Sequence, residues 1–476
     1  MLVKSVTAGL RRRRLLDHTK FNLGNQPGLL TKYGYANEVH EVQTEDGYLL
    51  TMHRIPRGRG QAEGDRPVVF LMHGLFSSSA DWIIMGPQSG FGNTKSGTLK
   101  TVGTDSKVLK IDESEFVVIF YKRFAVICLR RNLKNFLPPQ MLHSRTSPTK
   151  CSPSENSAGT VTIYRQFGYL KHSFSAYYLA DEGFDVWMGN ARGNFYSRKH
   201  ATLDPDQDSS FWKFSWNEIG YYDLPAMIDY VLAKTGNTQL NYAGHSQGTT
   251  SFFVMAALRK EYNAKIKLMS ALAPVAYMSN LESPLVHYLA PIANTVELLT
   301  SLIGINELLP SSDLMAQAAE LLCKDNSPMQ PVCTNFLFLF CGANPELLNA
   351  TMLPIILAHT PAGASSKQAV HYGQEFMSAM FRKYDFGTVI NLIEYKRTTP
   401  PDYELKGVTA PVALYYSVND YLANQIDVEQ LYSELANPVA KVKVPHPLFN
   451  HLDYLWAIDV RPLLYDGVIA LMKEYA

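Results

Sequence analysis

A serine between two glycines is the strongest chemical signal in the chain. Residues 244–248 read Gly-His-Ser-Gln-Gly, a G-x-S-x-G pentapeptide centred on Ser246. Two glycines permit a tight strand-to-helix turn, which projects the serine hydroxyl outward. An apolar run beginning at Leu240 leads into the motif, and a helical pattern from Thr249 to Glu261 follows it. Ser246 is therefore a candidate nucleophile.

A serine hydroxyl needs a base, and the base needs an orienting carboxylate. After a G-x-S-x-G serine the chain order is acid and then histidine. Only His446 and His451 follow the last long strand-like segment. His446 lies between two prolines, as a turn residue does, whereas a loop long enough to reach back to Ser246 precedes His451. We predict His451 as the base.

Asp420 is the predicted acid because it ends the strand-like run 411–420, where a side chain would face the site. Asp427 and Asp453 compete for this role, but both fit surface or helix-start positions better.

When such a serine attacks a carbonyl group, an oxyanion forms on the carbonyl oxygen, and backbone N–H donors must stabilise it. One is expected from Gln247, directly after the serine, and the other from Leu75 in the loop His73-Gly74-Leu75-Phe76. His73 is a second candidate base, but we interpret it as a structural histidine that supports this turn.

The elements that would position these residues alternate between strand and helix. This alternation predicts an α/β fold with a mostly parallel sheet and a ligand site at the carboxyl ends of its strands. Residues 277–405 instead show apolar helical segments with Pro and Gly breaks, which indicates an inserted helical region. The predicted strands are Val68 to Gly74, Phe184 to Gly193, Leu240 to Ser246, Ile266 to Ala276, Pro411 to Asp420 and Ala440 to Pro445.

Composition excludes several other classes of protein. The 476 residues are 46% hydrophobic and 18% charged, so the chain can bury a large core. Lys plus Arg number 44 and Asp plus Glu 43, without the basic excess of a nucleic-acid binder. No apolar run approaches the length of a membrane-spanning helix. Zinc signatures are absent, and we expect no metal and no organic cofactor.

Residues 91–173 differ from the rest of the chain. They carry 13 Lys and Arg against five Asp and Glu, and their part from His143 to Thr162 is rich in Ser, Thr and Pro. Such a composition is typical of an irregular loop.

The sequence resembles the acid lipase family of α/β-hydrolases, which includes gastric and lysosomal acid lipases, and its insect members most of all. The likeness covers roughly residues 28–90 and 174–474. The stretches that carry it are KYGYANEVHEVQTEDGYLLTMHRIP, VFLMHGLFSSSADWIIMGP, YLADEGFDVWMGNARGNFYSRKH, YDLPAMIDYVLAKTG, GHSQGTT, TPAGASSKQAVHYGQ, YDFG and FNHLDYLWA.

This resemblance implies an α/β-hydrolase fold, with a core formed by 28–276 and 406–476 and a helical cap with a movable lid over 277–405. It assigns the same catalytic residues as the motifs do: Ser246, Asp420, His451, Leu75 and Gln247. The apolar segment Leu285 to Leu309 would form cap core or meet lipid when the lid opens.

The resemblance also pairs Cys323 with Cys333 and leaves Cys341 free. A disulfide requires an oxidising compartment. The sequon Asn349-Ala350-Thr351 is a candidate glycosylation site and also suits a secreted protein. We therefore expect secretion or a lysosomal location.

Two segments depart from the family pattern. Residues 1–27 show no secretory signal peptide, so we expect an N-terminal extension in which that signal is missing or altered. About 80 unrelated residues, the basic segment 91–173, follow the oxyanion loop. We interpret them as translated non-coding sequence, or as an irregular surface loop where the protein contains them.

The leading function is a lipase that hydrolyses triacylglycerol or sterol ester at a lipid interface. The alternatives are a carboxylesterase for small soluble esters and a catalytically inactive lipid-binding protein. No oligomeric state is predicted.

Overall fold

The computed structural model describes residues 26–87, 108–110, 116–121, 124–129, 176–292, 295, 304 and 306–475. The chain forms two compact units, of which one comprises Met1–Gly90 with Leu170–Ala476 and the other comprises Phe91–Tyr169. Most of the predicted N-terminal extension 1–27 lies outside the described residues.

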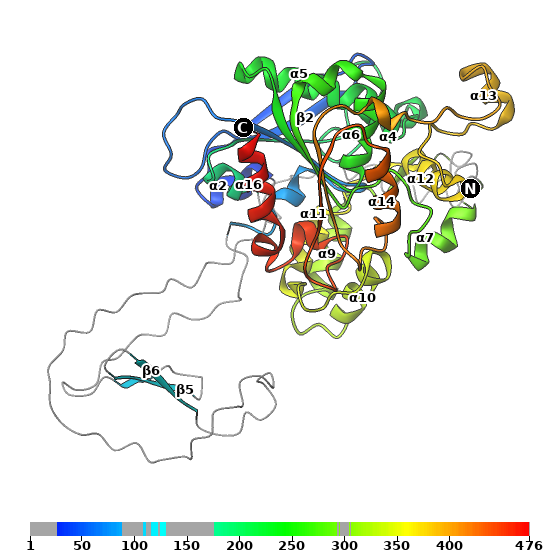
Figure 1. The fold of residues 1–476 in the computed structure, drawn as a ribbon. Coiled ribbons are helices and arrows are strands. Elements are labelled where there is room, and N and C mark those ends of the chain that lie inside the picture. Colours follow the sequence, from blue (N-terminus) through cyan, green and yellow to red (C-terminus); the bar gives the residue numbers. More distant parts are fainter. Residues whose placement is uncertain are drawn as a thin grey trace. The chain divides into compact units, whose positions relative to one another are not determined.

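An eight-stranded sheet is the centre of the first unit (Figure 1). Its strands follow the spatial order β1-β2-β7-β3-β8-β9-β12-β13. All pairs from β7 to β13 are parallel, and β1 and β2 add an antiparallel edge. The strands are β1 (Glu38–Gln43), β2 (Leu49–Ile55), β3 (Val68–Met72), β7 (Asp185–Gly189), β8 (Leu240–His245), β9 (Ile266–Leu272), β12 (Val412–Tyr416) and β13 (Pro438–Lys443).

The central strands consist of residues that are buried on both faces. Every residue of β3, β7 and β8 is buried. Continuous apolar runs of this kind are typical of parallel strands that helices cover on both sides. The helices that belong to this α/β core are α2 (Gln26–Lys32), α3 (Ala176–Asp181), α5 (Leu224–Thr235), α6 (Gln247–Leu258), α14 (Gln425–Glu434) and α16 (Asp466–Glu474). The predicted α/β-hydrolase fold with a mostly parallel sheet is confirmed.

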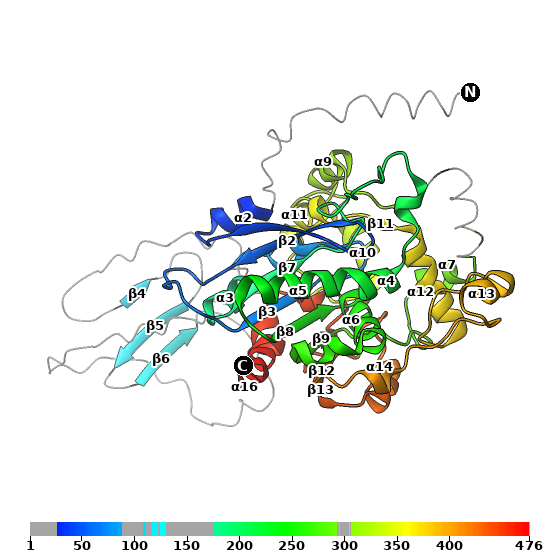
Figure 2. The ribbon, with the colours of Figure 1, turned by 90° about the horizontal axis from the view of Figure 1, so that it is seen from above.

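The chain between β9 and β12 is mainly helical. Helices α9, α10 and α11 lie together in both ribbon views, and α13 lies at the outer edge beyond α12 (Figures 1 and 2). Much of the predicted apolar segment Leu285 to Leu309 lies outside the described residues. The helices are α7 (Pro284–Leu289), α9 (Asp313–Leu322), α10 (Gln330–Cys341), α11 (Leu353–His359), α12 (Ser366–Ser378) and α13 (Thr388–Glu394).

The second unit contains an antiparallel sheet of three strands, in the order β4-β5-β6. They are β4 (Val108–Lys110), β5 (Phe116–Tyr121) and β6 (Phe124–Leu129). The expectation of an irregular loop is wrong for these residues. The Ser, Thr and Pro content on which it rested belongs to a later part of the segment, whereas β5 and β6 are apolar and rich in β-branched and aromatic residues, which favour strands.

Candidate active site

Ser246 occupies a sharp turn between β8 and α6. Its φ of 52° and ψ of −119° are a strained conformation for a residue with a side chain, at a cost of about 1–3 kcal/mol. Both glycines of the pentapeptide are sterically required. A Cβ on Gly244 would lie 2.7 Å from the Gly248 carbonyl carbon, and one on Gly248 would lie 2.3 Å from the Met72 carbonyl oxygen.

A chain of hydrogen bonds joins the predicted serine, histidine and aspartate. His451 Nε2 lies 2.8 Å from Ser246 Oγ. His451 Nδ1 lies 2.9 Å from both carboxylate oxygens of Asp420. The three residues come from the turn after β8 and from the loops after β12 and β13, so the carboxyl ends of parallel strands bring them together. With Nδ1 protonated, Nε2 can accept the serine proton.

The Asp420 carboxylate is buried but well supplied with donors. Its Oδ1 accepts the N–H groups of Leu422 at 2.9 Å and Ala423 at 2.8 Å. Burial acts to raise the pKa of Asp420, but the nearby His451 ring and these donors together hold that pKa below its ordinary value. The side chain is therefore an anion that can orient the imidazole and stabilise its protonated form.

The competing histidine lies outside this chain of hydrogen bonds. His446 Nε2 is 3.2 Å from a carboxylate oxygen of Glu346, and His446 Nδ1 accepts the N–H of Leu448. These contacts are those of a turn residue.

Both competing acids lie in the first turn of a helix and are buried there. The carboxylate of Asp427, in α14, accepts the backbone N–H of Asn280 at 2.9 Å. Asp453 begins α15 (Asp453–Trp456) and accepts hydrogen bonds from the Asn344 amide at 2.6 Å and the Asn450 N–H at 2.8 Å. Neither carboxylate bonds a histidine among the described residues.

The loop predicted to complete the oxyanion hole lies against Ser246. A Cβ built on Gly74 would be 3.3 Å from Ser246 Cβ, so the backbone of this loop approaches the serine closely. Leu75 follows Gly74 directly, and Gln247 begins α6. The next residue, Phe76, has a φ of 58°, and its carbonyl accepts the N–H of Ala362 at 2.6 Å. The backbone of both predicted donor residues therefore lies beside Ser246.

His73 holds this loop in place. Its Nδ1 donates to the Gly74 carbonyl at 2.8 Å, and its Nε2 accepts the N–H of Ala191 at 3.1 Å and the Asn194 amide at 3.1 Å. Burial lowers the pKa of His73 to about 4, so the ring is neutral and both nitrogens are engaged. This arrangement is that of a structural histidine.

Two contacts at the site had not been predicted. His245 Nε2 donates to the backbone carbonyl of His451 at 2.8 Å, and burial lowers the pKa of His245 to about 3. Gln368 of α12 accepts a 2.7 Å hydrogen bond from the side chain of Gln247. His245 occupies an unconstrained position of the motif, and Gln368 is 121 residues away from its partner, so neither carried a signal in the sequence.

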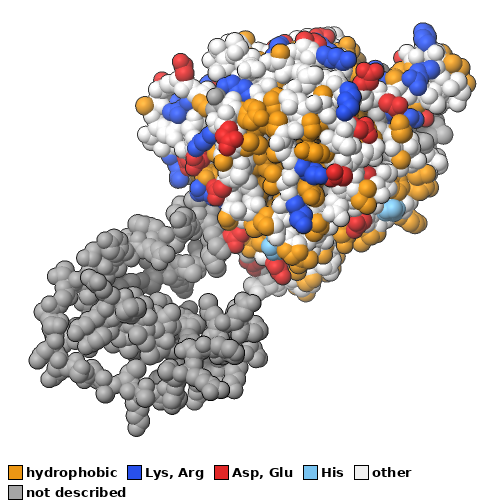
Figure 3. All heavy atoms as spheres, in the orientation of Figure 1, with side chains coloured by type: hydrophobic (Ala, Val, Ile, Leu, Met, Phe, Trp, Pro, Cys, Tyr) orange, Lys and Arg blue, Asp and Glu red, His pale blue; other side chains and the backbone are white. Residues whose placement is uncertain are grey.

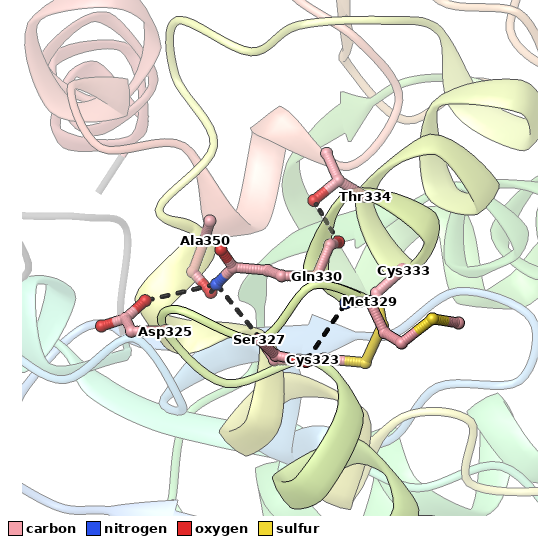
Figure 4. The surroundings of a disulfide bond; sticks show 8 residues. All are labelled: Cys323, Asp325, Ser327, Met329, Gln330, Cys333, Thr334 and Ala350. Atoms are coloured by element: carbon pink, nitrogen blue, oxygen red, sulfur yellow. Dashed lines mark hydrogen bonds between the residues drawn. A yellow bond between two sulfur atoms is a disulfide. The ribbon is translucent and has the colours of Figure 1, made fainter.

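Cys323 and Cys333 form a disulfide between α9 and α10, as the resemblance implied, and Cys341 is free and buried. Figure 4 shows the Gln330 side chain beside this disulfide. It donates to the carbonyls of Cys323 and Ala350 and to the Asp325 carboxylate.

The sequon lies in the same neighbourhood, because the carbonyl of its second residue, Ala350, accepts the hydrogen bond from Gln330. Asn349 directly precedes the short helix Ala350–Met352. The Thr351 hydroxyl of the sequon donates to the Asp325 carboxylate at 3.2 Å. Asn349 is half-buried and Thr351 is exposed.

None of the helices in the described part of the chain is both long and apolar enough to cross a bilayer. No group of three or more His, Cys, Asp or Glu side chains in that part of the chain could hold a metal ion.

The sheet order, the serine turn and the hydrogen-bonded Ser-His-Asp arrangement define an α/β-hydrolase. Sequence comparisons agree, since a family described as a partial α/β-hydrolase lipase region matches residues 27–86 and one described as the α/β hydrolase fold matches 168–403. The chain belongs to the acid lipase family of α/β-hydrolases and is a carboxylic ester hydrolase.

Three relatives show how far this similarity extends. Lipase 3 of Drosophila melanogaster is 39% identical over 93% of this chain and 91% of the relative. The lysosomal acid lipase/cholesteryl ester hydrolase of Homo sapiens is 32% identical over 95% of this chain and 91% of the relative. The gastric triacylglycerol lipase of Bos taurus is 31% identical over 94% of this chain and 91% of the relative.

Proposed function

We propose that this chain is a lipase that hydrolyses the ester bonds of neutral lipids, triacylglycerol or sterol ester, through an acyl-enzyme on Ser246. The observation that carries the proposal is the continuous hydrogen-bond chain from Ser246 Oγ through His451 to Asp420. The substrate class is supported by relatives that are named as triacylglycerol and cholesteryl ester hydrolases.

In the first half of the reaction, Ser246 Oγ attacks the ester carbonyl carbon while His451 Nε2 takes the hydroxyl proton. The backbone N–H groups of Leu75 and Gln247 stabilise the resulting oxyanion. The tetrahedral intermediate then collapses, and His451 donates the proton to the departing alcohol.

In the second half, water attacks the acyl-enzyme with His451 again acting as base. The fatty acid leaves and the Ser246 hydroxyl is restored. Asp420 keeps the imidazole in the Nδ1–H form and stabilises the imidazolium, without itself taking the proton.

The helical region 277–405 is the proposed cap, and lipid at an interface is the proposed form of the substrate. Two contacts between this region and the site support that role: Gln368 bonds the side chain of Gln247, and the Ala362 N–H bonds the Phe76 carbonyl. A movement of the cap would therefore act directly on the oxyanion loop and on the residue after the nucleophile.

A secreted or lysosomal location, with glycosylation at Asn349, completes the proposal. The Cys323–Cys333 disulfide supports it, because such bonds persist in oxidising compartments.

The test is to label the full-length protein with a serine-reactive phosphonate and to map the adduct by mass spectrometry. We expect the adduct on Ser246 and none in the Ser246→Ala variant. Hydrolysis of emulsified triacylglycerol should then exceed hydrolysis of a dissolved short-chain ester. Absence of labelling in the wild-type protein would overturn the proposal, and a preference for the dissolved ester would replace the lipase with a small-ester carboxylesterase.

A further inference from the structure

Helix α13 presents its apolar side chains to solvent. Four of its seven residues are large aliphatics with 48 to 72% of their surface exposed: Val389, Ile390, Leu392 and Ile393. A helix that packs on a globular core shows the opposite arrangement. Contiguous exposed apolar side chains of this kind mark an interaction surface, whereas isolated ones do not.

The one buried residue of α13 is polar. Asn391 is 1% exposed, and its Oδ1 accepts the N–H of Phe386 at 3.0 Å. Its Nδ2 donates to the Asp385 carboxylate at 2.7 Å and to the Thr398 carbonyl at 3.1 Å. These hydrogen bonds, rather than apolar packing, hold the helix on its loop. The aliphatic face therefore remains free for an external partner.

Two exposed cations follow the helix after Tyr395. The Lys396 ammonium donates to the Ile393 carbonyl at 2.8 Å, which places this charge at the C-terminal end of the helix. Arg397 comes next, and neither cation forms an ion pair with an acid in the described part of the chain. Figure 3 shows apolar and basic side chains side by side on the projection that carries α13. Apolar residues next to unpaired cations match the two layers of an anionic lipid surface.

We propose that α13 anchors the enzyme to a lipid surface, with its four aliphatic side chains in the apolar layer and Lys396 and Arg397 at anionic headgroups. The anchor rests on the proposed function, because the substrate of a lipase is assembled at such a surface. A second copy of the chain is a weaker partner for this helix. Four partly exposed side chains fall well short of the ~800 Å² that each partner buries in a stable dimer.

The anchor also lies close in the chain to the active site. Gln368 at the start of α12 contacts Gln247, and α13 begins ten residues after α12 ends. A helix of 13 residues is roughly 20 Å long, so α12 connects the lipid-facing helix to the neighbourhood of Ser246.

The experiment measures flotation of the full-length protein with vesicles of phosphatidylcholine and phosphatidylserine. The variant Ile390→Ser/Ile393→Ser should lower vesicle partitioning at least about thirtyfold, because two aliphatic side chains no longer enter the bilayer. Lys396→Gln/Arg397→Gln should weaken binding about fivefold per charge on these vesicles and have no effect on pure phosphatidylcholine.

The matched control is Val439→Ser/Val442→Ser on strand β13, where the two valines are 36 and 40% exposed. Its flotation should equal that of the wild-type protein, and all variants should hydrolyse a dissolved ester at the wild-type rate. Wild-type protein that does not float, or an α13 variant that floats normally, would overturn the anchor. So would an α13 variant that changes only self-association in light scattering. Normal flotation without phosphonate labelling would overturn the proposed function and leave the anchor intact.

Discussion

Three histidines lie around the nucleophile, and their hydrogen-bond partners separate their roles. His451 alone faces a carboxylate, at 2.9 Å from Asp420. His73 and His245 bond backbone carbonyls, and burial lowers the pKa of each ring well below that of a free histidine. Because these two rings are neutral, neither of them places a second positive charge beside His451. In the proposed mechanism Asp420 therefore stabilises the positive charge on His451, and neither of the other two rings opposes it.

Replacement of Asp420 by Asn tests this division of roles. Asp420→Asn should reduce kcat for a dissolved ester by about a thousand- to ten-thousandfold, since the neutral amide cannot hold His451 in the required tautomer or stabilise its protonated form. KM should change little, because the Asp420 side chain is buried and bonded to His451. Steady-state kinetics provide the measurement. Asp453→Asn is the matched control and should retain kcat, and an equal loss in both variants would contradict the assignment of the acid.

Asp453 supplies a prediction about pH. Burial raises the pKa of its carboxyl from an ordinary 3.8 to about 7 in the folded protein. Below pH 4 the Asp453 carboxyl is protonated in both the folded and the unfolded protein. Between pH 4 and 7 it ionises in the unfolded protein but keeps its proton in the folded protein. Stability therefore falls as pH rises through this range, by roughly a few kcal/mol. The thermal midpoint should be higher at about pH 5 than at about pH 8.

The Asp453→Asn variant should flatten this pH dependence, because its amide does not titrate and can still accept the hydrogen bonds of Asn344 and Asn450. Asp313→Asn, at the exposed start of α9, is the control and should retain the wild-type slope. If the thermal midpoint of Asp453→Asn depends on pH as strongly as that of the wild-type protein, other titratable groups cause this dependence.

At the scale of elements, burial on both faces explains why the central strands could be predicted. β3, β7 and β8 read as continuous apolar runs and were predicted. β1 alternates between half-buried and exposed residues, and with β2 it forms the antiparallel edge, which the prediction lacked. A short alternating strand with charged residues at the edge of a sheet gives a weak signal.

Some parts of the site could be predicted from the sequence and others could not. The residues of the G-x-S-x-G turn are local in the sequence, and the chain order of acid and histidine indicated Asp420 and His451. Contacts such as that between Gln247 and Gln368 depend on how the cap region packs on the core. No spacing or residue type in the sequence encodes that packing, so these contacts became visible only in three dimensions.

The disulfide between α9 and α10 should stabilise the cap. It joins residues ten positions apart, and closing so short a loop contributes about 2–3 kcal/mol. Cys323→Ser/Cys333→Ser should lose about this much stability in urea denaturation followed by tryptophan fluorescence. The effect should reach the site, because α10 ends at Cys341, whose carbonyl accepts the His451 N–H at 3.2 Å.

A reductant provides the control for this prediction. It should destabilise the wild-type protein and Cys341→Ala equally and leave the double variant unchanged. A double variant that still responds to reductant would show that the effect arises elsewhere.

At the scale of the whole molecule, the division into two units separates catalysis from the basic segment. Ser246, Asp420, His451 and the oxyanion loop all belong to the unit formed by 1–90 and 170–476. The unit 91–169 contains its own antiparallel sheet and most of the excess positive charge of segment 91–173. We therefore expect removal of the second unit to reduce the positive charge of the protein and to leave the proposed catalytic residues in place.

Joining Gly90 to Leu170 should leave a protein that folds and is labelled by the phosphonate at Ser246. Its kcat for a dissolved ester should stay within about threefold of the full-length value, because no residue of the triad is removed. Binding to anionic vesicles should weaken and lose part of its salt dependence, since a basic segment contributes about 1 kcal/mol per charge near such a surface. Binding to neutral vesicles should persist, because α13 remains. A deletion protein that folds but is not labelled would contradict this separation and would mean that Ser246 is reactive only when residues 91–169 are present.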